Sequence, residues 1–206
     1  MSYLEIACSL KRAAFLAISL MGLMGVVASV AGCSDRARIG ASAGDVRFSE
    51  ANLLGNPGFE DEVETFAPWL RHVHADGESF TFAEDETVYR EGSKSIRIER
   101  VTPEPYASIV QSFRKQKLLN QRYRLSAWVR GADLSSPVYL HANFFSYGSP
   151  SGEVGGPAAG LRGTFDWARL ELDVALPERF DRAEFGLSTT GDGTVWIDAV
   201  ELVPIP

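Results

Sequence analysis

Short runs of alternating apolar and polar residues fill the chain from residue 52 onward, and this period of two sets the strongest limit on the fold. Successive side chains of a β-strand point to opposite faces of a sheet, so such runs predict strands with one buried side. The runs lie at 80–82, 96–98, 108–113, 123–130, 138–144, 168–174, 183–188 and 194–202. Because no convincing helical stretch separates them, the chain is predicted to be all-β, an antiparallel sandwich or barrel.

Prolines and glycines mark the expected connections between strands. Eight prolines are predicted to fall between the runs, where no ladder N–H is lost: Pro57, Pro68, Pro103, Pro105, Pro137, Pro150, Pro157 and Pro177. The stretch 146–164 stands apart because it holds six glycines and two prolines among mostly small residues. It is predicted to be a long loop, either a binding loop or a mobile segment.

Length and composition are sufficient for one folded domain. The chain has 206 residues, of which 45% are hydrophobic and 11% aromatic, so a hydrophobic core can form. Of its two cysteines, Cys8 lies in a segment expected to be removed, which leaves Cys33 without a disulfide partner in the product. Core burial, with or without a metal ion, then has to stabilise the domain.

The net charge argues against one class of partner. The formal charge is −7, and removal of the leader with Lys11, Arg12 and Glu5 makes it −8. A surface that binds phosphates needs clustered Lys and Arg side chains to release counterions. An acidic domain instead repels polyanions, so nucleic acid is not expected as a partner.

The N-terminal 32 residues have the pattern of an export signal. Lys11 and Arg12 precede an uncharged apolar run at 13–30. A transmembrane anchor is the alternative, since about 18 apolar residues is the lower limit for spanning a bilayer. The residues at the end of this run favour the export signal.

Val30-Ala31-Gly32-Cys33 resembles the lipobox of bacterial lipoproteins. The resemblance implies that Cys33 receives lipid and that cleavage removes residues 1–32. Several acyl chains anchor firmly, because each buried methylene contributes about 0.8 kcal/mol. Ser34, rather than aspartate, follows the cysteine, which by resemblance favours the outer membrane of the cell envelope. Residues 33–50 are then the lipidated cysteine and a flexible tether, and 51–206 the folded domain.

Five segments resemble carbohydrate-binding modules of families 4, 9, 16 and 22, which are galactose-binding-like jelly rolls. In chain order they are 52–60 (NLLGNPGFE), Trp69, 91–98 (EGSKSIRI), 123–130 (YRLSAWVR) and 196–202 (WIDAVEL). The resemblance spans about residues 52–203 and implies a jelly-roll sandwich. The chain departs from the family pattern at 119–122, where a Pro-Gly pair is common, and at Ala199, where a second aspartate is common.

The same resemblance implies a structural calcium ion. In the family, a glutamate of the opening motif and an aspartate of the last strand bind calcium, helped by backbone carbonyls of a Gly-Ser turn. The matching residues are Glu60 and Asp198, with the carbonyls of Glu91 and Lys94 as completions. Calcium takes about six to eight hard oxygen ligands, and a metal that ties the first segment to the last strand would stabilise the fold. Ordinary surface acids at these positions are the alternative.

Sugar recognition needs aromatic faces that stack on pyranose C–H groups and polar groups that reach the ring hydroxyls. By resemblance, Tyr106 lies near an aromatic residue of the family's cleft. One face of a strand is polar and aromatic, whereas its other face is apolar; the first face carries Tyr139, His141, Asn143, Phe145 and Tyr147. Of these, the last four are predicted to contact the sugar together with Tyr106. Alternatively, Phe145 and Tyr147 cover a core edge or pack under the glycine-rich stretch. The four tryptophans are predicted to pack in the core or on the sheets.

Catalysis is not expected from this sequence. Acidic residues gather at 60–64 and 84–86, but a glycosidase needs two carboxyls about 5–10 Å apart across a deep cleft, and charged loops explain the acids better. His72 and His74 have a spacing that some metal sites use, yet His141 is the only further histidine. No nucleophile elbow, phosphate loop or dinucleotide fingerprint is present.

Two functions of different classes remain. In the first, the domain binds polysaccharide or cell-wall glycan at the cell envelope and holds it near separate glycoside hydrolases. In the second, it is an envelope scaffold or protein-interaction module that keeps the fold without binding sugar. Fold-level likeness does not by itself decide between them.

Overall fold

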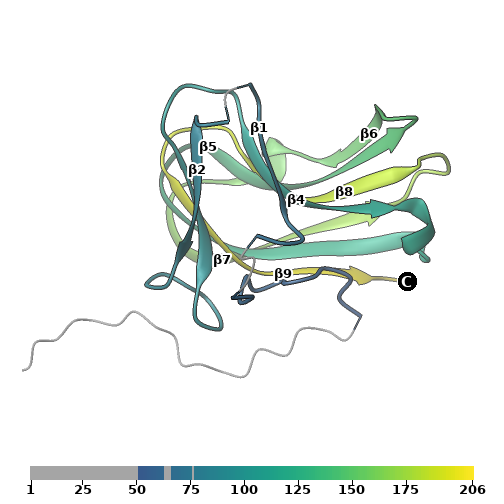
Figure 1. Ribbon diagram of the computed structural model, residues 1–206, viewed down its shortest axis with the longest axis horizontal. Helices are drawn as coiled ribbons and strands as arrows, with labels where there is room; N and C mark the ends of the chain where they lie inside the picture. Colours follow the sequence, from purple (N-terminus) through teal and green to yellow (C-terminus); the bar gives the residue numbers. More distant parts are fainter. Residues whose placement is uncertain (1–50, 63–65, 76) are drawn as a thin grey trace, which may run out of the picture. The chain divides into compact units, whose positions relative to one another are not determined.

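Nine strands and two short 3-10 turns make up the described part of the chain, residues 51–62, 66–75 and 77–206, in the computed structural model (Figure 1). The strands are β1 (Leu70–Val73), β2 (Phe80–Asp85), β3 (Ser95–Arg100), β4 (Ala107–Arg114), β5 (Arg122–Ser146), β6 (Ser149–Gly155), β7 (Leu161–Ala175), β8 (Arg182–Thr189) and β9 (Thr194–Pro204). The turns are η1 (Lys115–Lys117) and η2 (Pro157–Ala159). None of the helical segments among these residues has the length and apolar character to cross a bilayer. The predicted leader, Cys33 and the tether lie outside the described residues.

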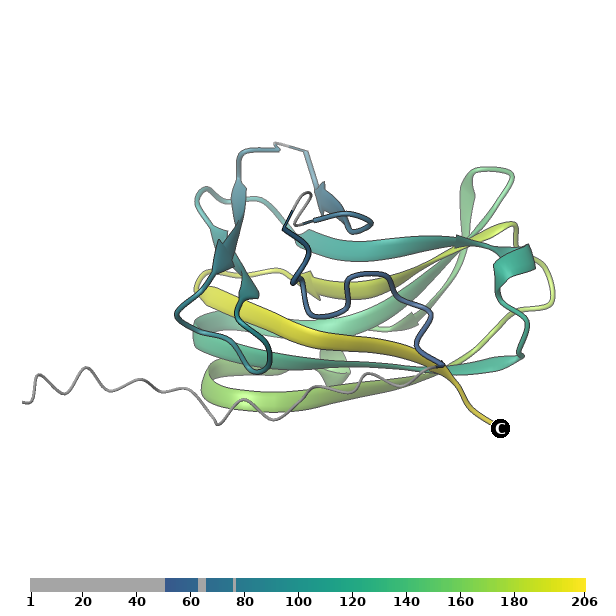
Figure 2. The same cartoon turned by 60° about the horizontal axis from the view of Figure 1, so that its bottom comes forward.

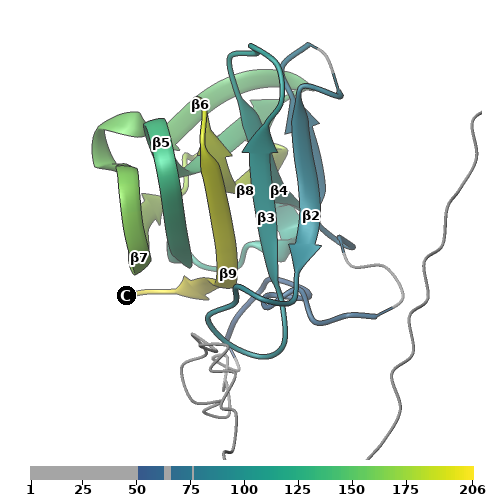
Figure 3. The same ribbon diagram turned by 90° about the vertical axis from the view of Figure 1, so that its left-hand side faces the viewer.

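The strands form two layers that share β5 (Figures 2 and 3). Residues 122–134 of β5 pair with β7 and 123–132 with β9, whereas residues 138–145 pair with β8 and 141–146 with β6. Val138, where the two parts meet, pairs with both β7 and β8. The first layer is therefore β2-β3-β9-β5-β7, and the second is β1-β4-β8-β5-β6. Every pairing is antiparallel, which confirms the predicted all-β sandwich of the jelly-roll type.

The 25-residue strand β5 corrects one detail of the sequence prediction. Two separate runs were expected at 123–130 and 138–144, with Pro137 in the connection. Instead the strand continues through both layers, and its register with β7 shifts between Val129 and Val138. Pro137 lies where the pairing is interrupted, so its missing N–H removes no ladder hydrogen bond.

The core fills the space between the two layers. Leu125, Ala127 and Val129 of the first layer and Phe144, Phe185 and Leu187 of the second are among its buried side chains. Trp69 joins this core, but Trp128 and Trp196 do not. They lie on the outer face of the first layer, where the guanidinium groups of Arg90 and Arg130 stand 4.4 Å and 5.7 Å from the respective ring centres.

The glycine-rich stretch 146–164 is not the long loop that the sequence predicts. It contains strand β6, which pairs with the second half of β5 in a hairpin, and the short turn η2. Gly155 has φ +98°, and a Cβ there would collide with the Leu140 carbonyl oxygen, so this glycine permits the close approach of the two strands. Pro150 is tolerated within β6 because this strand pairs with β5 alone among the described strands.

The opening segment runs beside the last strand (Figure 2). The Leu53 amide donates to the Leu202 carbonyl at 2.9 Å, and the Val200 amide donates to the Pro57 carbonyl at 2.9 Å. The Asn52 side chain adds bonds to the backbone of Val200 and Leu202. The resemblance predicts this adjacency of the first and last segments. The adjacency brings the side chains of Glu60 and Asp198 to the same turn, residues 90–94.

Candidate functional site

A cleft of about 790 Å³ is hollowed into the outer face of the second layer. Its volume lies within the range of known ligand sites. The lining residues come from β1, the segment before β4, and strands β4, β5, β6 and β8: His72, Val73, Tyr106, Ser108, Tyr139, His141, Asn143, Phe145, Pro150, Gly152, Glu153, Arg182, Glu184 and Ser188.

Strand register assembles this lining in rows. One row runs across four strands and contains His72, Ser108, Ser188 and Tyr139. The row of Gly186, His141 and Gly155 follows, and the next contains Glu184, Asn143 and Glu153. Arg182, Phe145 and Pro150 form the last row. Alternation along each strand points all these residues away from the core, which places them together on the outer face.

The floor of the cleft is more deeply buried than the outer face of a sheet normally is. His141 is 3% exposed, Glu184 is 7% exposed, and Ser108 and Ser188 are each 5% exposed. Polar side chains are rarely buried on a solvent-facing surface unless they serve another purpose. The floor therefore offers desolvated polar groups to a ligand in the cleft.

His141 lies in the floor of the cleft with both ring nitrogens buried. Neither ring nitrogen makes a hydrogen bond of normal geometry within the described residues. Burial lowers the pKa of His141 to about 4, a hydrogen-bonding interaction with the Leu187 backbone opposes this shift, and the charge of His72 adds to it. Both cross-strand neighbours are glycines, Gly186 and Gly155, and the row continues beyond Gly186 to the buried Val110. A buried polar group without a partner costs free energy, which a hydroxyl from a ligand can recover.

Arg182 and Phe145 form one end of the cleft. The Arg182 guanidinium carbon lies 3.9 Å from the centre of the Phe145 ring, and its Nη1 contacts the Glu184 carboxylate. The same Nη1 is 3.3 Å from the Ser112 hydroxyl. These contacts hold Phe145 in place and pair the charge of Glu184 with that of Arg182.

Tyr106 and Tyr139 contribute aromatic surface near the other end. Tyr106 is 40% exposed, and its ring meets the His74 ring edge-on at 5.5 Å. His74 is in turn 3.0 Å from Glu104. Burial raises the pKa of the Tyr139 phenol, the hydrogen bond with Ser188 lowers it, and the charge of Glu153 raises it further. Tyr139 is therefore a neutral phenol at physiological pH.

Four of the five predicted sugar contacts lie together in this cleft: Tyr106, His141, Asn143 and Phe145. Tyr147 does not, because it lies in the turn between β5 and β6, where its residue is 98% exposed. The sequence did not single out Arg182, Glu184 or Glu153 as site residues. Charged residues on the outer side of a strand normally face water, so their alternation with apolar residues gave no signal of a cleft.

A second polar cluster, here called the seam, consists of Glu60, the turn 90–94 and Asp198. One Asp198 carboxylate oxygen accepts from the amides of Arg90 at 2.8 Å and Glu91 at 2.9 Å, and the other accepts from Ala199 at 2.7 Å. Glu60 accepts from the Ser93 amide at 3.0 Å, the Ser93 hydroxyl at 2.5 Å and the Lys94 amide at 3.2 Å. The two carboxylates thus bind the same turn.

The donor chemistry of the seam fits a calcium ion. Burial raises the pKa of Asp198 to about 7, its backbone hydrogen bonds oppose the rise, and the charge of Glu60 adds to it. A cation beside Asp198 would favour the charged form of this carboxylate. Gly92 has φ +66°, and a Cβ there would strike the Glu60 carboxylate. The carbonyls of Glu91 and Lys94 belong to this turn, and calcium prefers such hard oxygens.

The seam brings together two carboxylates that bind the turn, those of Glu60 and Asp198. Nowhere in the described residues do three or more histidine, cysteine, aspartate or glutamate side chains gather in a way that can hold a metal ion. Calcium would therefore depend on backbone carbonyls for its remaining protein ligands. His72 and His74 are likewise separate in role, because His72 lines the cleft and His74 pairs with Glu104.

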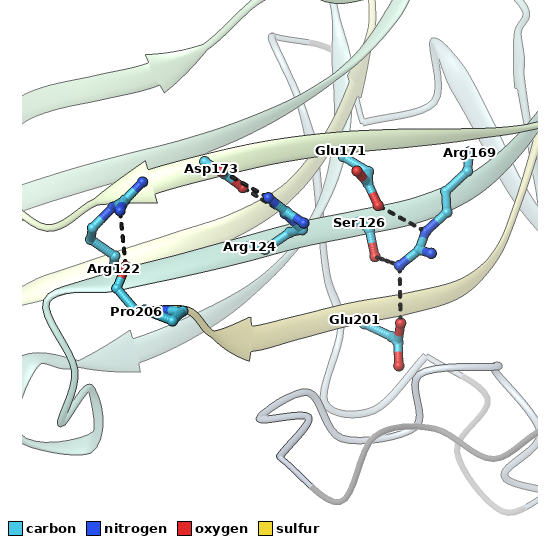
Figure 4. Close-up of polar contacts among 8 residues, drawn as sticks. All are labelled: Arg122, Arg124, Ser126, Arg169, Glu171, Asp173, Glu201 and Pro206. Atoms are coloured by element: carbon cyan, nitrogen blue, oxygen red, sulfur yellow. Dashed lines mark hydrogen bonds and ion pairs between the residues drawn. The ribbon is translucent and has the colours of Figure 1, made fainter.

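The outer face of the first layer carries charges that are already paired (Figure 4). Arg124 binds both carboxylate oxygens of Asp173, at 2.7 Å and 3.0 Å. Arg169 lies 3.4 Å from Glu171 and 3.4 Å from Glu201. This is the solvent-facing side that the alternation at 168–174 predicts, and these charged side chains interact with one another.

Comparison with known proteins places the fold. No family model and no curated protein matches the chain. The C-terminal family 22 carbohydrate-binding module of Clostridium thermocellum Xyn10B is similar in structure, with a TM-score of 0.55 and 12% identity over 77% of this chain and 97% of that one. A family 16 carbohydrate-binding module has a TM-score of 0.51 and 18% identity, over 74% and 99% of the two chains.

A third structure is the enzymatically active domain of tailspike protein 4 from bacteriophage CBA120, with a TM-score of 0.58 and 16% identity. This match covers 75% of the present chain and 22% of the tailspike chain. At such identities the likeness concerns the fold. The described part of this chain therefore has the jelly-roll fold of carbohydrate-binding modules, as the sequence resemblance predicts.

Proposed function

We propose that this domain binds carbohydrate in the cleft on its second layer and does not turn it over. The observation that carries the proposal is the lining, where aromatic side chains and buried polar groups meet on one concave surface. Tyr106, Tyr139 and Phe145 supply faces for pyranose C–H groups. Asn143, Ser188 and His141 supply donors and acceptors for ring hydroxyls. The fold shared with carbohydrate-binding modules supports this assignment.

The two carboxylates of the cleft have roles in binding rather than catalysis. Glu184 interacts with Arg182, and Glu153 lies on the exposed edge strand β6 on the other side of Asn143. Hydrolysis of a glycoside needs one protonated acid and one carboxylate on opposite sides of the scissile bond. Glu184 is instead engaged by Arg182 within the wall of the cleft. Release of reducing ends from a glycan by the purified domain would contradict this assignment.

Affinity electrophoresis against a panel of glycans tests the proposal. Gels containing β-glucans, galactan, mannan, xylan or peptidoglycan fragments should retard the wild-type domain in at least one case. Asn143→Ala should weaken the retardation about tenfold, because it removes a partly buried amide from the centre of the cleft. Asn120→Ala is the matched control, since Asn120 is exposed and lies outside the lining. Unretarded wild-type protein in every gel would overturn the proposal.

We also propose that calcium binds the seam and stabilises the fold. Glu60 and Asp198, with the carbonyls of Glu91 and Lys94, would hold it. A ligand that binds only the folded state raises stability by an amount that grows with its concentration. Added calcium should therefore raise the unfolding temperature of the wild-type domain, and a chelator should lower it. The Asp198→Asn variant should not respond, and an equal response of both proteins would exclude the seam as the site.

We infer further that the chain is exported and anchored by lipid at Cys33, in the outer membrane of a double-membraned host. The motif at 30–33 and the apolar run before it support this inference. The anchored domain would then hold glycan near separate glycoside hydrolases or other envelope proteins. Fractionation and fatty-acid labelling of cells that express the full chain test this inference. The wild type should enter the membrane fraction and incorporate labelled fatty acid, whereas Cys33→Ser should not incorporate it. Fatty-acid labelling that persists in Cys33→Ser would refute the anchor.

A further inference from the structure

The charges of the cleft are biased toward one sign. Its lining contains two carboxylates, Glu153 and Glu184, and one guanidinium, Arg182. Arg182 already contacts Glu184 and stacks on Phe145, so its charge is engaged within the wall. Glu153 has no ion-pair partner among the described residues, and it is exposed on the edge strand β6. The unbalanced charge that faces the cleft is therefore that of Glu153.

The charge of Glu153 acts across the cleft rather than only into solvent. After burial and the bond with Ser188, it is the next contributor to the pKa of Tyr139, which it raises. Tyr139 lies on β5, and it faces the same cleft. A negative group placed between these side chains would meet the same repulsion. Like charges at a separation of about 5 Å repel each other by about 1 kcal/mol even in water-like surroundings.

The floor of the cleft favours an uncharged polar group for a separate reason. The His141 ring is buried and neutral, its nitrogens make no hydrogen bond of normal geometry within the described residues, and it lies between two glycines. A neutral imidazole has one donor nitrogen and one acceptor nitrogen. A hydroxyl group matches either nitrogen, since it can donate and accept.

We propose that the cleft selects uncharged, hydroxyl-bearing sugar chains and that Glu153 makes it discriminate against chains that carry uronate. This inference rests on the proposed function, because it names the class of glycan that the same cleft takes. Glu153 is the specificity-determining residue, and Glu184 with Arg182 forms a neutralised wall. The domain's overall negative charge acts in the same direction over longer distances.

Pairs of oligosaccharides that differ only at C6 test the proposal. The probes are β-1,4-linked glucose, galactose and mannose oligosaccharides and their derivatives with the primary alcohol oxidised to carboxylate. Titration calorimetry at neutral pH and low ionic strength measures both members of each pair. The wild-type domain should bind its neutral oligosaccharide at least about fivefold more tightly than the oxidised form. Added salt should narrow this ratio, because it screens the repulsion.

Two variants separate a local effect from a global one. Glu153→Gln should reduce the ratio of neutral to oxidised affinity toward one. Glu171→Gln is the matched control, because it removes the same charge from the outer face of the other layer, next to Arg169 (Figure 4). It should leave the ratio as it is in the wild type. Both glutamates are exposed, so neither substitution removes a core contact.

Three outcomes would overturn the inference, and they can be told apart. Equal or tighter binding of the oxidised oligosaccharide by the wild type would exclude charge selection while leaving sugar binding intact. An equal response to Glu171→Gln would show that net charge, rather than Glu153, sets the preference. Binding of neither member of any pair, together with no retardation in the glycan gels, would overturn the proposed function itself.

Discussion

Asp198 in the seam and His141 in the cleft are both buried titratable side chains on strands, and they differ in how they are paired. Asp198 accepts three backbone hydrogen bonds, from Arg90, Glu91 and Ala199. His141 has none of normal geometry within the described residues. Burial favours the neutral form of both groups, so it raises the pKa of Asp198 and lowers the pKa of His141. A paired buried group stabilises a fold, whereas an unpaired one stores a cost that a ligand can recover.

Removal of the Asp198 side chain should have the largest effect on stability. Asp198→Ala leaves the amides of Arg90, Glu91 and Ala199 without their acceptor in a site with no exposed surface. Urea unfolding should show a loss of at least about 3 kcal/mol. Asp198→Asn, which keeps one oxygen acceptor, should lose less. If alanine costs no more than asparagine, the hydrogen bonds of the seam do not stabilise the fold as argued.

In calcium-free protein, Asp198 and His141 should change the free energy of unfolding in opposite directions as the pH rises. Asp198 has its folded pKa raised from 3.8 to about 7, so its contribution is present at low pH and is lost as pH rises through this window. His141 has its folded pKa lowered from 6.5 to about 4, so its contribution is present at high pH and is lost as pH falls. Across its pH window, each group changes the free energy of unfolding by about 3–4 kcal/mol.

In the wild type these two slopes should partly cancel between pH about 4 and 6.5. Asp198→Asn should then become more stable as pH rises, because the His141 slope remains. A variant without the His141 imidazole should become less stable as pH rises, because the Asp198 slope remains. Urea unfolding of the three proteins with chelator, across this range, measures the slopes. Parallel curves for all three would rule out these two residues as the source of the dependence.

His141→Phe should separate binding from stability more clearly than any other substitution in the cleft. The phenyl ring is similar in size and removes both unpartnered nitrogens. Because replacing an unpaired buried polar group by an apolar one is neutral or stabilising, the unfolding midpoint should not fall. Affinity for the retarding glycan should nevertheless decrease about tenfold, through loss of a hydrogen bond to the sugar. A variant that loses stability and keeps its affinity would assign His141 to the structure alone.

The same contrast explains which features were predictable from the sequence. Alternation along β5 predicts that His141, Asn143 and Phe145 share a face, because side chains two residues apart on a strand point the same way. The resemblance to carbohydrate-binding modules places Glu60 and Asp198 at a common turn. Neither the alternation nor the resemblance indicates how the His141 nitrogens are hydrogen-bonded. The surroundings of the ring depend on its cross-strand neighbours Gly186 and Gly155, which come from strands distant in sequence.

Strand β6 and the charged side chains of β8 show where sequence reasoning fails. β6 is rich in glycine and proline, so propensity favours a loop, yet pairing with β5 overrides it. Arg182 precedes the predicted strand at 183–188 and Glu184 lies within it, and both read as ordinary solvent-facing charges. Arg182 and Glu184 are two residues apart on one face of β8, but the contact of Arg182 with Phe145 depends on the register between β8 and β5, which local pattern does not encode.

The smallest expected effect compares two tyrosines that the sequence treated alike. Tyr106 lines the cleft at 40% exposure, whereas Tyr147 lies in a turn at 98% exposure and outside the lining. Tyr106→Ala should weaken glycan retardation about fivefold, since it removes one stacking face, and Tyr147→Ala should not change it. Both substitutions affect exposed side chains, so the unfolding temperatures of the two variants should match that of the wild type. An equal loss from Tyr147→Ala would mean that the sugar chain extends past the β5–β6 turn and that the binding surface is longer than the cleft.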